Sequence, residues 1–176
     1  MNNWGVYMKN DVIDNGRIAV YAGTFDPITL GHIDVIKRAV RIFNKVIVAI
    51  TTNPRKTPLF TIEERVQLAK DALANIENVE VESFTGLLVD YMKRKGAKTV
   101  LRGLREVSDF SYEFQQAIIN RKLYSEVDTV FIMTSPEYFY INSTIVKELV
   151  KLGACVKGFV PENVEVALKK KLSDEK

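Results

Sequence analysis

A single imidazole, His32, ends the segment 21–32, which reads Tyr-Ala-Gly-Thr-Phe-Asp-Pro-Ile-Thr-Leu-Gly-His. This segment leaves an apolar, strand-like run at 18–21 through a turn of small residues and opens an amphipathic helix at 31–32. The first backbone amides of a helix lack internal partners and attract anions, and Gly23 allows the backbone to come close to a ligand. We therefore expect a phosphate at this helix start, within reach of the imidazole. A histidine near a helix start is more often structural, and only the preceding loop favours a functional role.

Arginine side chains follow a later strand-like run. Arg102 and Arg105 come after the run 99–101 in the order Arg-Gly-Leu-Arg. Their planar guanidinium groups suit bidentate binding of phosphate, and the glycine between them permits close approach. The alternative is a structural ion pair with Asp109 or Glu113.

A third basic group lies in the loop 53–58, Asn-Pro-Arg-Lys-Thr-Pro, where two prolines restrict the backbone around Lys56. Such loops are usually only solvated, although this one would present its cations at an edge of the sheet. Other chemistries are excluded. The only histidine has no second histidine and no nearby cysteine for a histidine-rich metal site, and no serine beside it has an acid partner for a catalytic triad.

Composition narrows the class of protein. Lysine and arginine exceed aspartate and glutamate by 25 to 22, and part of this excess lies in a lysine run at 169–171, so the net charge does not argue for nucleic acid. Cys155 is the only cysteine and cannot form an internal disulfide, which is consistent with a reducing compartment. Its apolar neighbours predict that its side chain is buried. No apolar run approaches the roughly 20 residues that span a bilayer, and the start of the chain lacks a signal-like segment. We expect a soluble cytoplasmic protein without a membrane partner.

Strand and helix patterns alternate from residue 17 onward. Strands are expected at 18–21, 46–51, 79–84, 99–101 and 129–133, and helices from 31 onward and at 61–75, 87–95, 109–123, 144–152 and after Pro161. Thr61 with Glu64, Ser108 and Ser143 are the expected N-caps, and Gly96 and Gly153 the expected stops. This alternation predicts an α/β fold: a Rossmann-like, doubly wound, five-stranded parallel sheet with helices on both faces.

The domain organisation is simple. The polar segment 1–16 is expected to be an N-terminal extension, and 17–176 a single domain with a C-terminal helix. Polar clusters at 24–32, 53–56, 85–88, 102–105 and 135–144 each follow an expected strand. Because the carboxyl ends of parallel strands share one edge of the sheet, these clusters should form one site.

The quoted motifs resemble a known group. Gly-Thr-Phe-Asp-Pro at 23–27 followed by Thr-Leu-Gly-His at 29–32 resembles the T/HxGH signature of the nucleotidylyltransferase superfamily. The longer form of this motif, together with Arg-Gly-Leu-Arg at 102–105 and Asp-Phe-Ser-Tyr-Glu at 109–113, resembles the phosphopantetheine adenylyltransferase family over nearly all of 17–172. The resemblance implies in-line transfer of AMP from ATP to 4′-phosphopantetheine, giving 3′-dephospho-coenzyme A and pyrophosphate with no covalent enzyme intermediate.

The resemblance also implies roles for individual residues. Those for catalysis are His32, Lys56 and Arg102, with His32 stabilising charge on the α-phosphate. Those for the acceptor substrate are Thr24, Lys56, Leu88 and Arg102. Those for ATP are Thr24, Phe25, His32, Gly103, Leu104, Arg105, Glu113, Tyr138, Phe139, Tyr140, Ile141, Asn142, Ser143 and Thr144. Asn142 departs from the serine usual at that position, although an amide can still form a hydrogen bond.

Cofactor and partners follow from the same resemblance. Mg²⁺ is expected to accompany ATP, held mostly by water and phosphate oxygens and not by a protein metal site. A homo-hexamer and feedback binding of coenzyme A are implied. Two alternatives stay open: another small nucleotidylyltransferase, with nicotinate mononucleotide or glycerol phosphate as acceptor, and a non-catalytic nucleotide-binding protein. The His motif also occurs in class I aminoacyl-tRNA synthetases, but this chain is short and shows no Lys-Met-Ser-Lys-Ser-like loop.

Overall fold

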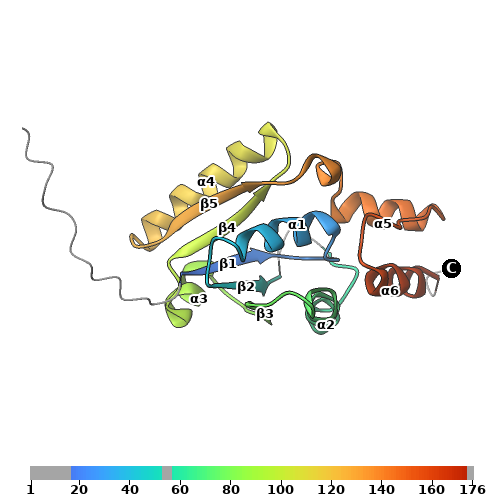
Figure 1. Cartoon of the computed structure of the whole chain (residues 1–176), viewed down its shortest axis with the longest axis horizontal. Helices are drawn as coiled ribbons and strands as arrows, with labels where there is room; N and C mark the ends of the chain where they lie inside the picture. Colours follow the sequence, from blue (N-terminus) through green and yellow to red (C-terminus); the bar gives the residue numbers. More distant parts are fainter. Residues whose placement is uncertain (1–16, 53–56, 174–176) are drawn as a thin grey trace, which may run out of the picture.

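The computed structural model describes residues 17–52 and 57–173 and shows strands and helices in alternation (Figure 1). The strands are β1 (Ile18–Gly23), β2 (Lys45–Ile50), β3 (Val79–Ser83), β4 (Thr99–Leu104) and β5 (Asp128–Met133). The helices are α1 (Leu30–Ala39), α2 (Ile62–Leu73), α3 (Leu88–Lys95), α4 (Val107–Leu123), α5 (Ser143–Lys151) and α6 (Glu162–Ser173), with a short 3-10 helix η1 (Pro136–Tyr138) before α5. The expected extension at 1–16 and Lys56 lie outside the described residues.

The strands form one parallel sheet in the order β3-β2-β1-β4-β5. The chain winds outward from β1 to one edge, returns, and adds β4 and β5 on the other side. The crevice for ligands in such a sheet lies outside the carboxyl ends of the strands where the direction of winding changes, here β1 and β4. The predicted doubly wound fold is confirmed.

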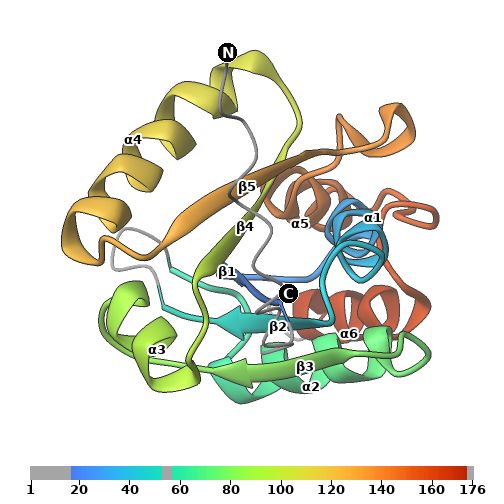
Figure 2. The ribbon, with the colours of Figure 1, turned by 60° about the vertical axis from the view of Figure 1, so that its left-hand side comes forward.

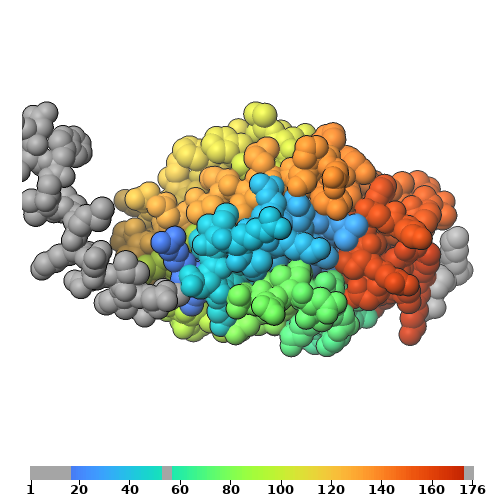
Figure 3. Space-filling model, viewed as in Figure 1, coloured from blue at the N-terminus to red at the C-terminus, as the bar shows by residue number. Residues whose placement is uncertain are grey.

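Both faces of the sheet are buried, as parallel strands require. Ala19 and Tyr21 of β1 belong to the larger core, under α1, α2 and α6. Val20 and Ala22 belong to the smaller core, under α3. Figure 2 shows α3 and α4 on one side of the strands and α1, α5 and α6 on the other. In the space-filling view of Figure 3, α1 covers the middle of the face turned toward the viewer. Among the described residues no helix is long and apolar enough to cross a membrane.

Of the three N-caps expected from the sequence, only the one at Thr61 is confirmed. Thr61 and Glu64 form the predicted capping box, with the Glu64 N–H 3.2 Å from Thr61 Oγ1 and the Thr61 N–H 2.8 Å from Glu64 Oε2. Gly96 ends α3 with a φ of 64°. The expectation that Ser108 caps α4 is wrong, because α4 begins at Val107 and has no side-chain cap.

β4 is longer than its apolar pattern indicated. The strand pairs with β5 as far as Leu104, so Arg102 and Gly103 lie within it and not after it. A Cβ on Gly103 would come 3.0 Å from the Tyr21 hydroxyl and 3.1 Å from a methyl group of Val35. Glycine therefore allows β4 to pass close to the buried side chains of β1 and α1.

Cys155 was expected to be buried, and this is wrong. Its side chain is exposed in the segment between α5 and α6, while the neighbouring Val156 is buried. In the apolar run 154–156 only Val156 is buried, so the pattern did not indicate which residue faces inward.

Candidate active site

Three strand-end segments meet at the carboxyl edge of the sheet. Arg102 of β4 donates from Nη1 to the carbonyl of Ala22 in β1 at 2.6 Å. Ser143 donates from its hydroxyl to the carbonyl of Pro27 at 2.8 Å, which joins the start of α5 to the turn after β1. The convergence expected from the sequence is therefore confirmed for these segments.

The turn after β1 is organised around Phe25. This residue has a φ of 43°, and it is only 3% exposed. A Cβ on Gly23 would lie 3.0 Å from that ring, so glycine is needed there to make room for the side chain of Phe25. The ring packs edge-on against His32, with 5.0 Å between ring centroids. The buried side chain of Phe25 thus positions the imidazole, and the half-buried Thr24 precedes it in the turn.

The imidazole is held by its own helix cap. Thr29 is the N-cap of α1 and His32 is the third residue of the helix, where a capping box ordinarily has glutamate or glutamine. The backbone N–H of Thr29 donates to Nδ1 of His32 at 3.0 Å, and the His32 N–H donates to Thr29 Oγ1 at 3.4 Å. Because Nδ1 accepts a hydrogen bond, the proton of the neutral ring lies on Nε2. The cap therefore orients Nε2–H as a hydrogen-bond donor.

Arg102 and Arg105 form ion pairs with carboxylates of α4, which is the structural alternative considered from the sequence. Nε of Arg102 lies 2.9 Å from Oε2 of Glu113, with both side chains about one-fifth exposed. Arg105 binds Asp109 in a bidentate manner, at 3.2 Å from Nε and 3.1 Å from Nη2. Oε2 of Glu113 nevertheless receives no hydrogen bond from any described residue. The ion pair of Arg102 is therefore not an aligned hydrogen bond, and a phosphate could share or replace that carboxylate.

Tyr21 connects the imidazole with the arginines. Its buried ring lies 6.2 Å from the His32 ring between centroids. Burial raises the pKa of the Tyr21 hydroxyl far above its ordinary value, and the charges of Arg102 and Glu113 act on it in opposite directions. Arg105 lies near enough to lower the same pKa. The imidazole thus lies beside Tyr21, and Arg102 bonds to the carbonyl of Ala22, the next residue of the same strand.

The aromatic segment before α5 is anchored to α1. Asp34, two residues after the histidine, accepts hydrogen bonds from the backbone N–H and the hydroxyl of Ser135, each at 2.9 Å. Tyr138 is half-buried, and Phe139 and Tyr140 are about half exposed. The exposed rings follow directly on a segment fixed to the helix of His32, so they border the same edge.

The expectation that Ser143 caps α5 is wrong. Asn142 is the N-cap, because its Oδ1 accepts the backbone N–H of Ile145 at 2.8 Å, and Ser143 is the first helical residue. Asparagine caps helices as well as serine does. The departure from the serine-rich signature therefore preserves a helix cap at this position.

The remaining predicted residues lie at the rim or in the core. Leu104 and Ile141 are buried, and Thr144 is exposed in the first turn of α5. Leu88 begins α3 and packs partly against the smaller core, on the face of the sheet opposite α1. Lys56 falls outside the described residues, so its proposed contact with phosphate stays a prediction.

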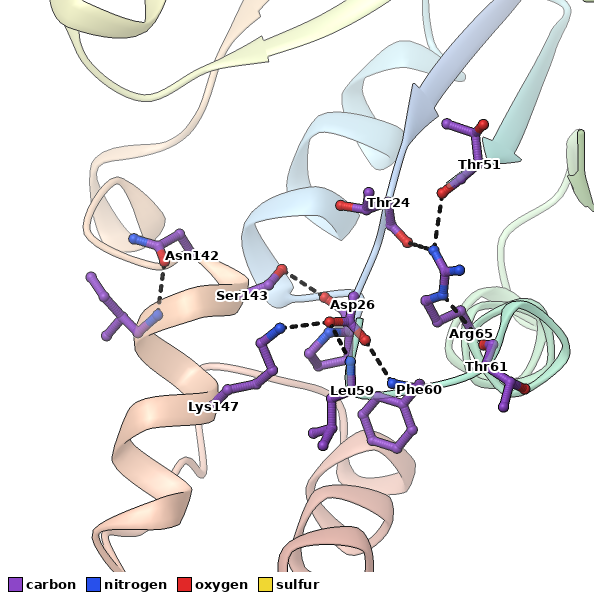
Figure 4. Close-up of polar contacts among 12 residues, drawn as sticks. Thr24, Asp26, Thr51, Leu59, Phe60, Thr61, Arg65, Asn142, Ser143 and Lys147 are labelled. Atoms are coloured by element: carbon purple, nitrogen blue, oxygen red, sulfur yellow. Dashed lines mark hydrogen bonds and ion pairs between the residues drawn. The ribbon is translucent and has the colours of Figure 1, made fainter. Parts of the chain in front are cut away.

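Three charged residues were missed by sequence reasoning. Asp26 and Arg65 are 5% and 2% exposed, and Lys147 of α5 pairs with Asp26 (Figure 4). Asp26 lies inside the motif at 23–27, and this position could have indicated a role for its carboxylate. Arg65 is one of several charged residues of the amphipathic helix α2, and the hydrophobic pattern of that helix gave no indication that it is buried. Within the described ranges, no group of three or more His, Cys, Asp and Glu side chains could hold a metal ion.

Comparisons with known proteins agree with this geometry. The cytidylyltransferase-like family model matches residues 20–149 of the chain. The phosphopantetheine adenylyltransferase of Caldanaerobacter subterraneus subsp. tengcongensis is 52% identical over 155 residues, which cover 88% of this chain and 97% of that protein. The phosphopantetheine adenylyltransferase of Carboxydothermus hydrogenoformans is 51% identical over 159 residues, with 90% and 98% covered. That of Clostridium novyi is 53% identical over 148 residues, with 84% and 92% covered.

A solved structure is also similar. The crystal structure of a protein from Vibrio parahaemolyticus, assigned as a nicotinate-nucleotide adenylyltransferase, superposes with a TM-score of 0.63. The match covers 86% of this chain and 97% of that chain at 17% sequence identity. At this identity the likeness concerns the fold, and it agrees with the doubly wound sheet.

Proposed function

The chain belongs to the cytidylyltransferase-like family and, within it, to the phosphopantetheine adenylyltransferases, and on this premise we propose that it transfers AMP from ATP to 4′-phosphopantetheine. The products are 3′-dephospho-coenzyme A and pyrophosphate, and the reaction is reversible. The proposed reaction is a step of coenzyme A biosynthesis. The observation that carries the proposal is that the capped imidazole of His32 lies beside Tyr21 of β1, while Arg102 of β4 bonds to the carbonyl of the next residue, Ala22, where the winding of the sheet changes.

The proposed reaction is a direct displacement at phosphorus. An oxygen of the acceptor's phosphate attacks the α-phosphorus of ATP, the bond from that phosphorus to the oxygen bridging to the β-phosphate breaks, and pyrophosphate leaves with the electron pair. His32 donates from Nε2 to an α-phosphate oxygen, where negative charge increases in the transition state. Because the Thr29 cap fixes the ring beforehand, little reorganisation is needed during the reaction.

Substrate binding is divided between the segments. We propose that Arg102, Lys56 and Thr24 hold the phosphate of the acceptor, and that Leu88 contacts its pantetheine arm. The ATP side comprises the aromatic segment 138–144, the start of α5, Arg105 and Glu113. The bidentate pair of Arg105 with Asp109 shows a guanidinium already held in the geometry that suits a phosphate.

Mg²⁺ is proposed as the companion of ATP. The described residues present no carboxylate cluster that would form a resident site, and Mg²⁺ commonly keeps water and phosphate oxygens as ligands. When bound, the ion neutralises phosphate charge. His32, Arg102 and Arg105 would then act on oxygens that the ion does not occupy.

We propose that the chain works as a homo-hexamer in the cytoplasm and binds coenzyme A as a feedback ligand. The support for assembly is α4, a helix of 17 residues in which no residue is buried. Phe114, Ile118 and Leu123 are each about half exposed, and Val107 is 87% exposed. Apolar side chains along a whole helix indicate a surface covered by another copy. Ile118→Glu should lower the mass measured by sedimentation equilibrium, and an unchanged hexamer would exclude α4 from the contact.

A pyrophosphate-release assay with alternative acceptors tests the activity. We expect release with ATP and 4′-phosphopantetheine, and release at least about 100-fold slower with nicotinate mononucleotide or glycerol phosphate at equal concentration. Faster release with either of these acceptors would assign the chain to another substrate. Tight ATP binding without release for any acceptor would indicate a non-catalytic nucleotide-binding protein.

A further inference from the structure

Two buried charged residues, Asp26 and Arg65, and the half-buried Lys147 lie next to the candidate site, and we call these three residues the clamp (Figure 4). Arg65 is 2% exposed and is the largest of the fully buried side chains. The clamp residues come from the turn after β1, from α2 and from α5, so the cluster joins parts that are far apart in the sequence.

Arg65 bonds to backbone carbonyl groups at the ends of two neighbouring strands. Its Nη1 donates to the carbonyl of Thr24, directly after β1, at 2.7 Å and to the carbonyl of Thr51, directly after β2, at 3.0 Å. Its Nε donates to the carbonyl of Thr61 at 3.3 Å. One guanidinium group therefore sets the distance between the two strand ends and attaches both to the start of α2.

Asp26 completes the connection on the other side of the turn. Its two carboxylate oxygens accept the backbone N–H groups of Leu59 and Phe60 at 3.0 and 2.9 Å. Lys147 of α5 lies 2.5 Å from the same carboxylate. The turn that carries Thr24 is thus held by α2 on one side and by α5 on the other.

Stability alone does not explain these contacts. Buried charges lose hydration, and well-packed apolar side chains of similar volume are often equally stabilising. Burial lowers the pKa of Arg65, and the nearby charge of Asp26 opposes this shift. An apolar residue in place of Arg65 could not form hydrogen bonds with the carbonyls of Thr24 and Thr51. These carbonyls lie at the edge of the sheet where the phosphates are proposed to bind.

We propose that Arg65 is a positioning residue for adenylyl transfer, which holds the turn after β1 so that Thr24 and His32 face the reacting phosphates together. The inference rests on the proposed function. Arg65 does not touch substrate, and it acts through the carbonyls of Thr24 and Thr51.

Arg65→Lys tests this role, with Lys171→Met as the matched control. Lysine keeps the charge, but its compact ammonium group cannot reproduce a fork that bonds to three carbonyls. Lys171 contacts Glu64 at 2.7 Å, so its substitution removes a charge bound to the same helix and leaves the strand ends alone. The assay measures kcat and KM for ATP and 4′-phosphopantetheine, divided by the folded fraction, together with Tm.

We expect Arg65→Lys to lower kcat about 30- to 100-fold, with KM values changed less than about threefold, because small displacements of aligned groups act mainly on the reacting geometry. Lys171→Met should keep kcat within about twofold of the unsubstituted chain. In Arg65→Ala, low millimolar guanidinium chloride should restore part of kcat, whereas sodium chloride at equal concentration should not.

Each outcome has a defined meaning. A kcat of Arg65→Lys equal to that of the control, or a loss that disappears on division by the folded fraction, would make Arg65 purely structural and overturn the proposal. Failure of both Arg65 variants to fold would overturn it equally. Turnover by the unsubstituted chain is measured in the same assay, so absence of activity there would refute the proposed function and not the role of Arg65.

Discussion

Replacing His32 with glutamine separates the two roles of the imidazole. Glutamine is the ordinary partner at the third position of a capping box, so its side-chain oxygen can accept the Thr29 N–H that Nδ1 now accepts at 3.0 Å. The amide then points back toward the cap. The donor on the far side of the ring, Nε2–H, is lost. His32→Gln therefore keeps the helix cap and removes the proposed contact with the α-phosphate.

The size of the effect follows from that contact. Loss of one donor to a developing oxyanion lowers kcat by about 10²- to 10³-fold, equivalent to about 2.7–4 kcal/mol. The KM for ATP should change less than about threefold, because the contact strengthens mainly in the transition state. Tm should stay within about 2 °C of the unsubstituted chain, because the cap persists. His32→Ala loses the cap as well and should lower Tm by a further 2–4 °C or so, for about 1 kcal/mol.

The assay is continuous pyrophosphate release at saturating ATP and 4′-phosphopantetheine, with calorimetry on the same preparations. A kcat of His32→Gln within about fivefold of the unsubstituted chain would refute the donor role. Equal losses in kcat and in ATP affinity would also refute it, because they would indicate a contact made as strongly in the ground state.

Three further predictions concern the fold around the site. Asn142→Ala removes the cap of α5 and should lower the free energy of unfolding by about 1 kcal/mol in urea denaturation, whereas Asn142→Ser should be nearly neutral. Gly103→Ala places a Cβ 3.0 Å from a buried tyrosine hydroxyl and should destabilise the chain by about 1–3 kcal/mol, and an unchanged urea midpoint would contradict this packing. The third prediction concerns pH. Burial disfavours the charged form of Glu82, but hydrogen bonds from Lys95 and Tyr91 outweigh this effect and lower the pKa of Glu82. Its stabilising contribution is then present above its unfolded pKa and lost as the pH falls through the folded one, so the Tm difference between the unsubstituted chain and Glu82→Gln should shrink from about pH 6 to about pH 3.

The fold could be predicted from the sequence because its periodic signals are strong. Apolar runs buried on both faces, a capping box at Thr61 and a stop at Gly96 all agree with one α/β arrangement. Errors occurred where a local contact replaced the expected cap. At α4, the carboxylate of Asp109 accepts the backbone N–H of Arg105 at 3.2 Å, so this turn is fixed without the predicted cap at Ser108.

The candidate site was predictable only in part. The motif located His32, but it did not reveal that the imidazole takes the place of the usual glutamate or glutamine as the acceptor in a capping box. Nor did the pattern reveal the clamp, because burial of Arg65 depends on carbonyl groups from strand ends 41 and 14 residues away in sequence. Contacts of this range arise from the topology of the sheet and leave no periodic signal.

An isotope experiment tests most directly whether the acceptor phosphate attacks ATP at this site. The unsubstituted chain would be given ATP and 4′-phosphopantetheine labelled with ¹⁸O at the terminal phosphate oxygens, and the products analysed by mass spectrometry. Attack of the acceptor phosphate on the α-phosphorus predicts that all of the label stays in 3′-dephospho-coenzyme A, one labelled atom bridging the new bond, and that pyrophosphate carries none. Label in pyrophosphate or in free AMP would contradict the account.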